Sequence, residues 1–181
     1  MLKQCFLFLW VVLLSMVFLN SCSHSKPDPE YTLAYLGDSN YFGVSKVERF
    51  QLSNGLKLLV LEDHSSPTFT YQTWFSVGSR DEQVGRTGLA HLFEHMMFKA
   101  TKKLASCEFD KILESAGAEG LNAFTSHDYT GYVQSLPVGN LELIASLEAD
   151  RMANLVVDSQ ALSFEREVVQ NERRFRNENN P

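Results

Sequence analysis

The sequence predicts an α+β fold, a two-layer sandwich in which helices pack on one face of a mainly antiparallel sheet. Two observations on pattern support it: five runs alternate in hydrophobicity as strands do, and four segments repeat at the helical period. In chain order these elements are three strands, two helices, two strands and two helices. The hydrophobic content of 44% in 181 residues is ordinary for a globular domain with its own core.

The first three strands are predicted between residues 48 and 77. Residues 48–52 and 56–61 flank Ser53-Asn54-Gly55, and Asn-Gly between two such runs is a strong hairpin signal. In the third run, 68–77, alternate side chains point to one side: Phe69, Tyr71, Thr73, Phe75 and Val77. A loop is expected at 78–85.

The remaining elements follow from caps and apolar stripes. Thr87 is predicted to cap the first helix and Ser106 the second, with Gly117 just past the second helix's end. Strands are expected at 120–125 and 129–136, and a helix opening at Asn140. A last helix is expected from about residue 160 toward 178. The inward stripe of the helix after Asn140 is predicted to be Leu141, Ile144, Ala145, Met152 and Leu155.

Residues 1–22 have the pattern of a lipoprotein signal peptide. Lys3 precedes an apolar run from Phe6 to Leu19, which is short for a membrane span and typical of a signal-peptide core. Cys22 would then be the first mature residue and carry the lipid; the alternative is an uncleaved N-terminal anchor. Residues 23–45 are predicted to be a polar tether, and 46–181 the folded domain. We therefore expect an exported, membrane-anchored lipoprotein of a bacterial cell envelope, facing the periplasm, with the outer membrane favoured.

Charge and cysteine content exclude two classes of protein. The formal net charge is −6, which argues against nucleic acid as a partner. Of three cysteines, Cys5 lies in the signal segment and Cys22 is the predicted lipid site, so only Cys107 is left in the domain. A disulfide-rich scaffold is therefore excluded.

A metal site is predicted on the first helix. His91 and His95 are four residues apart, hence on one face, and Glu94 lies beside them in an otherwise apolar segment. H-x-x-E-H is the inverted zincin signature. The plain alternative is a pair of hydrogen-bonded core histidines, so a third ligand is needed to decide.

The last helix offers that third ligand. Glu165 and Glu172 are seven residues apart, within about 20° of each other on a helical wheel, in an arc bracketed by apolar residues. Two carboxylates facing a core need a cation or hydrogen-bond donors. One would complete a His₂Glu site and the other would steady a ligand. Sequence geometry alone leaves the choice between them open.

At this point the chain resembles the inverzincin metallopeptidases, which include insulinase, pitrilysin and the mitochondrial processing peptidase. The resemblance covers about residues 46–181 and rests on motifs in the family's order: G-L-A-H-L-F-E-H-M-M-F at 88–98, L-N-A-F-T-S at 121–126, L-E-A-D-R-M at 147–152 and E-R-E-V-V-Q-N-E-R-R at 165–174.

The resemblance implies one zinc ion per chain, held by His91, His95 and Glu172. It implies that Glu165 supports the ligands and that Glu94 is the general base acting on a zinc-bound water. It also implies an edge strand for an extended peptide substrate at Asn122, Ala123 and Phe124, where Asn122 would hydrogen-bond the peptide backbone.

Family peptidases are built from several similar domains, and this chain matches less than one. We therefore expect a zinc endopeptidase, or the N-terminal part of one that is truncated within its first domain. One alternative is a non-catalytic or incomplete subunit that needs a homologous partner chain, or a missing C-terminal half, to form the peptidase chamber. The other is a lipoprotein scaffold with an accidental H-x-x-E-H.

Overall fold

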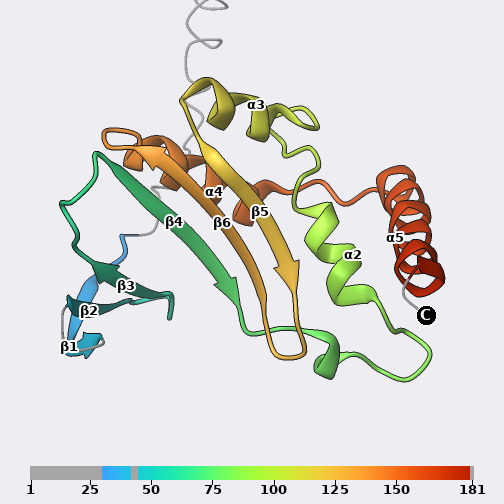
Figure 1. Ribbon diagram of the computed structural model, residues 1–181, viewed down its shortest axis with the longest axis horizontal. Helices are drawn as coiled ribbons and strands as arrows, with labels where there is room; N and C mark the ends of the chain where they lie inside the picture. The colour runs from blue at the N-terminus through green and yellow to red at the C-terminus, as the bar shows by residue number, and fades with distance from the viewer. Residues whose placement is uncertain (1–29, 42–44, 180–181) are drawn as a thin grey trace, which may run out of the picture. The chain divides into compact units, whose positions relative to one another are not determined.

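The computed structural model describes residues 30–41 and 45–179 (Figure 1). The chain divides into two compact units, one ending at Asp63 and one beginning at His64. The predicted signal peptide and the lipid site at Cys22 lie outside the described residues and stay predictions. Within the described ranges, no helix has both the length and the apolar character needed to cross a bilayer.

The first unit is a three-stranded antiparallel sheet. It contains β1 (Leu33–Tyr41), β2 (Ser45–Leu52) and β3 (Lys57–Leu61), in the order β1-β2-β3. The predicted hairpin between β2 and β3 is confirmed: Gly55 has a φ of 93°, and the Asn54 Oδ1 accepts the Leu56 N–H at 3.0 Å.

Strand β1 is not among the predicted strands, because the sequence predicts a polar tether at residues 23–45. Its pairing with β2 shifts register between Tyr35 and Gly37, which breaks the alternation that would have identified it. The Tyr35 ring packs on Phe50 of β2 with centroids 5.3 Å apart. Thus part of the predicted tether is a paired strand.

The second unit places helices on one face of another antiparallel sheet. Its strands are β4 (Thr68–Phe75), β5 (Glu119–Thr125) and β6 (Thr130–Pro137), in the order β4-β6-β5. The inward side chains of β6 meet the helices, and the opposite face carries Trp74 and Phe124. The predicted α+β class is confirmed, with the strands grouped in two sheets of three.

After β4 comes a 3₁₀ turn, η1 (Ser79–Asp81). The helices are α2 (Leu89–Met96), α3 (Glu108–Ser115), α4 (Leu141–Asn154) and α5 (Ser159–Asn179). The hydrophobic core lies between the sheet, α3 and α4 and consists of Phe109, Leu113, Leu136, Ile144 and Leu147.

Both predicted N-caps are wrong. Helix α2 begins after Gly88, whose φ of 92° suits glycine, and the Glu82 carboxylate accepts the N–H groups of Gly88 and Ala90 at 2.8 Å each. Helix α3 begins after Cys107 rather than Ser106, with Cys107 at a φ of 63°. A carboxylate six residues upstream can cap α2 because the intervening loop folds back, which local patterns do not reveal.

The predicted stripe of α4 is partly wrong as well. Ile144 is buried as expected, but Leu141, Ala145 and Met152 are exposed. The buried positions instead continue through Leu147, Glu148, Asp150 and Arg151. Glu148 and Arg151 can lie inward because they pair with each other, and Asp150 because it accepts a hydrogen bond from the Thr101 hydroxyl.

Arg151 and Glu148 form the ion pair at the centre of this unit. The Arg151 Nη2 lies 2.6 Å from the Glu148 Oε1, and both residues are almost fully buried. The guanidinium stacks on the Phe109 and Tyr132 rings, 4.6 and 4.5 Å from their centroids. The amide of Gln134 on β6 donates to the same Glu148 oxygen at 3.2 Å. One arginine therefore joins α4, α3 and the sheet.

Replacing Arg151 by methionine should lower the free energy of unfolding by roughly 3–5 kcal/mol, because it leaves the Glu148 carboxylate buried without its cation. Urea denaturation of both proteins measures the change. Arg166→Met, at an exposed position of α5, is the matched control. A loss no larger than that of the control would show that the pair does not stabilise the fold.

Candidate metal centre

Helix α2 presents two imidazoles to one point. His91 and His95 lie one turn apart on a helix whose other side is buried through Leu92 and Met96. Their Nε2 atoms are 3.2 Å apart, and both side chains keep some solvent exposure. Two imidazole nitrogens that face each other so closely need a proton or a cation between them.

Helix α5 packs on α2 and brings Glu172 to the same point. Its Oε2 lies 3.5 Å from the His91 Nε2, and its Oε1 lies 3.6 Å from the His95 Nε2. Taking one ligand atom from each residue, all three atoms lie within 4.8 Å of one another. In a tetrahedral zinc site with bonds of about 2.0–2.2 Å, neighbouring ligand atoms are about 3.4 Å apart. The donor set and its spacing therefore fit zinc.

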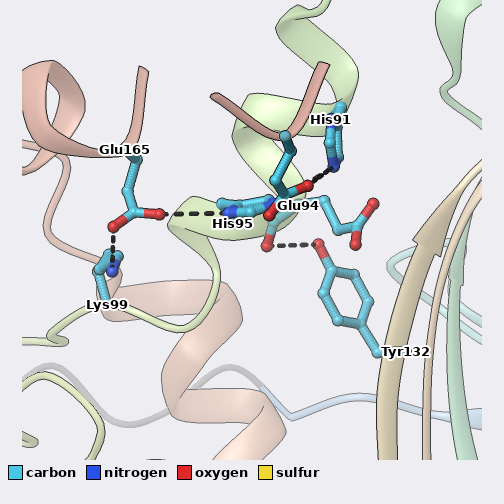
Figure 2. A network of polar contacts seen from close by, with 7 residues as sticks. His91, Glu94, His95, Lys99, Tyr132 and Glu165 are labelled. Atoms are coloured by element: carbon cyan, nitrogen blue, oxygen red, sulfur yellow. Dashed lines mark hydrogen bonds and ion pairs between the residues drawn. The ribbon is translucent and has the colours of Figure 1, made fainter. Parts of the chain in front are cut away.

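Glu165, the other candidate ligand, contacts the opposite side of His95. Its Oε2 is 3.2 Å from the His95 Nδ1, and its other oxygen pairs with the Lys99 ammonium (Figure 2). Glu165 is itself buried, at 4% exposure. A carboxylate at Nδ1 selects the tautomer whose Nε2 lone pair is available to a metal. The two glutamates thus occupy different places around one histidine.

Glu94 is buried beside this cluster and points to the sheet. The Thr125 hydroxyl on β5 donates to its Oε2 at 2.5 Å, and the Tyr132 hydroxyl donates to its backbone carbonyl at 3.5 Å. Burial raises the pKa of the Tyr132 phenol, so this hydroxyl keeps its proton. Both ends of the Glu94 residue are therefore fixed against β5 and β6.

A cavity of about 480 Å³ opens between α2 and β5. His91, Glu94 and three consecutive residues of β5 (Ala123, Phe124 and Thr125) are among its lining. Asn122, the third predicted substrate-binding residue, is not part of the lining. Its exposed side chain accepts the Ala123 N–H at 3.0 Å.

Side-chain alternation explains the different positions of these residues. Ala123 pairs with Tyr132, an inward residue of β6, whereas Asn122 pairs with Val133, which points outward. The Phe124 ring also turns outward and packs on Trp74 and Tyr129, with centroids 5.4 and 6.2 Å away. Asn122, Ala123 and Phe124 thus share a strand without sharing one face.

Sequence reasoning missed two polar residues of the site, Thr125 and Lys99. Thr125 lies two residues after Ala123 and so on the same face of β5. Lys99 is four residues after His95, which would place it on the histidine side had α2 continued. The sequence spacing of Thr125 and Lys99 could have identified both residues once the inward faces of α2 and β5 were known.

Comparison with known proteins places the chain in a family. The model of the insulinase family, peptidase family M16, matches residues 57–180. The zinc protease PqqE of Helicobacter pylori is 37% identical over 137 residues, which cover 75% of this chain and 31% of that protein. Cytochrome b-c1 complex subunit 1 of Rattus norvegicus is 34% identical over 118 residues, covering 65% of this chain and 24% of that protein.

A solved structure has the same fold. The crystal structure of a protease from Helicobacter pylori superposes with a TM-score of 0.73 at 37% identity, covering 76% of this chain and 33% of that one. The chain therefore spans about a third or less of the length of these relatives. The residues matched by the family model, 57–180, include α2, the whole sheet of the second unit and α5. The chain belongs to the insulinase family of peptidases, family M16.

Proposed function

We propose that the chain is the zinc-binding part of an endopeptidase that hydrolyses extended peptides. The observation that carries this proposal is the meeting of His91, His95 and Glu172 beside the buried Glu94, at the edge of a cavity. These three residues would hold the ion, and Glu165 would orient His95. Membership of a peptidase family and similarity to proteins named zinc proteases support the same reaction class.

In this proposal Glu94 is the general base. When bound, zinc supplies Lewis acidity, lowering the pKa of a water and polarising the peptide carbonyl. The Glu94 carboxylate takes the proton from the attacking water and passes it to the leaving amine. Its Oε2 is held by Thr125, which leaves its Oε1 for the proton.

Strand β5 would bind the substrate backbone. In the order β4-β6-β5 it is the edge strand of the second sheet as far as the structure describes it. An extended peptide can add to such an edge through backbone hydrogen bonds. Ala123 and Thr125 then lie next to the peptide and the metal, because both line the cavity with Glu94.

An alternative is a subunit that needs a homologous partner chain to complete the peptidase chamber. One observation favours it: one relative is named as a subunit of a larger complex. This alternative keeps the metal site and assigns the rest of the chamber to other residues.

Metal analysis and a peptide-cleavage assay on the purified chain test the proposal. We expect one zinc per chain, cleavage of a fluorogenic peptide library, loss of cleavage with a chelator and recovery with added zinc. Zinc without cleavage would favour the partner-dependent subunit, and co-expressed homologous chains should then restore cleavage. A chain that does not bind zinc at micromolar concentration would refute both.

Thr125→Val should reduce kcat and leave zinc content unchanged. The valine side chain has nearly the same shape but cannot donate to the Glu94 Oε2. Loss of one hydrogen bond to a charged group, worth about 1.5–3 kcal/mol, corresponds to about 10–100-fold in rate. Thr125→Ser keeps the hydroxyl and should retain most of the activity. Equal activity of the valine and serine variants would show that the hydroxyl does not position Glu94.

A further inference from the structure

Lys99 is the last residue in a series of contacts that leads away from the cluster of His91, His95 and Glu172. The chain turns after α2, where the Lys99 N–H donates to the Met96 carbonyl at 3.0 Å. The ammonium then meets the Glu165 Oε1, and the Glu165 Oε2 lies on the His95 Nδ1 (Figure 2). The order of contacts is therefore lysine, carboxylate, imidazole.

Both partners of the Lys99–Glu165 ion pair have little freedom to move, because both side chains are mostly buried. The Glu165 side chain is 5% exposed and the Lys99 side chain 21% exposed. The Lys99 Nζ also lies 5.9 Å from the centre of the Phe164 ring, on the residue that precedes Glu165 in α5. The ammonium is thus held by two neighbouring residues of one helix.

A buried carboxylate needs such a partner to stay in place, because an uncompensated charge is costly away from water. Hydrogen bonding to His95 uses one Glu165 oxygen only. Without Lys99, the second oxygen would be left in a largely buried position with no cation beside it. Glu165 would then turn toward solvent, and its hold on the His95 ring would weaken.

We propose that Lys99 is a positioning residue of the metal centre, which fixes Glu165 on the His95 Nδ1 and so presents the Nε2 lone pair before the ion binds. This inference rests on the proposed zinc site. It assigns to Lys99 no contact with metal or substrate, since its effect passes through Glu165.

Whether removal of Lys99 weakens or tightens zinc binding distinguishes a positioning role from simple charge repulsion. A lysine that acts only as a nearby positive charge opposes a divalent cation, so removing it should tighten zinc binding. A lysine that positions Glu165 helps the cation, so removing it should weaken binding. A lysine that only stabilises the C-terminal end of α2 should change thermal stability without acting through Glu165.

The experiment is a double-mutant cycle on zinc affinity in the full chain. Zinc dissociation constants are measured by competition with a chromophoric chelator for the wild type, Lys99→Met, Glu165→Gln and the double variant. Lys111→Met removes the same charge from an exposed position of α3 and serves as the control. Circular dichroism melting of each metal-free protein reports folding.

We expect Lys99→Met to weaken zinc binding about 10–100-fold, the range for partners of metal-ligating histidines. In the Glu165→Gln background the same change should alter affinity by no more than about two-fold. Lys99→Arg, which keeps the charge, should recover part of the loss. If Lys99→Met does not fold, the comparison of Glu165→Gln with the double variant carries the test, because neither has the unpaired carboxylate.

Three results would overturn the inference: tighter or unchanged zinc binding in Lys99→Met, an equal loss in both backgrounds, or a loss matched by Lys111→Met. Failure of the proposed function is distinct, because the wild type itself would then bind no zinc, or would bind it equally after replacement of His91 and His95.

Discussion

Glu94→Gln should abolish peptide hydrolysis while leaving zinc bound. General-base catalysis contributes about 10²–10⁴-fold to rate, and an amide cannot take the water's proton. The amide can still accept the Thr125 hydrogen bond, so the position of the side chain is preserved. Initial rates on a fluorogenic peptide and zinc content on the same preparation measure the two quantities together.

Glu167→Gln makes the same chemical change at an exposed position of α5 and should leave both quantities unaltered. If the Glu94 variant hydrolysed peptide at more than about a tenth of the wild-type rate, another group would be the base. Zinc lost along with activity would instead mean that Glu94 helps to hold the ion.

Glu172→Ala should lose zinc. The side chain contributes the only oxygen among the three candidate ligand residues, and it comes from a different helix than the histidines. Its removal leaves two ligands, so affinity should fall by more than the 10–100-fold typical of an outer hydrogen-bonding partner. Chelator competition gives the dissociation constant.

Thermal melting gives an independent check on Glu172. An ion that binds the folded chain alone raises its melting temperature. Added zinc should therefore stabilise the wild type and Glu167→Ala but not Glu172→Ala. Equal stabilisation of all three would place the zinc elsewhere on the chain.

The histidine half of the site could be predicted because it is local. One helical turn separates His91 from His95, so the i,i+4 spacing alone puts the two imidazoles together. The choice between Glu165 and Glu172 was not local. Glu165 and Glu172 lie on nearly the same face of α5 but are about 10.5 Å apart along the helix axis. Only the docking of α5 on α2 decides that Glu172 meets both Nε2 atoms and Glu165 meets Nδ1.

The misplaced elements also have a common physical origin. Strand β1 is hidden by a register shift, the α2 cap comes from Glu82 across a loop, and α4 buries an ion pair at positions outside its predicted apolar stripe. Each depends on a partner distant in sequence. Helix and strand positions followed from periodicity, whereas these features followed from tertiary contacts.

In the proposed metal centre, one zinc ion joins α2 to α5. The most direct test of this centre is an anomalous-scattering map at the zinc edge from crystals of the zinc-loaded chain. We predict a single strong peak about 2.0–2.2 Å from the Nε2 atoms of His91 and His95 and from a Glu172 carboxylate oxygen. A peak bound by other residues, or a Glu172 side chain turned away from both histidines, would refute the proposed metal centre.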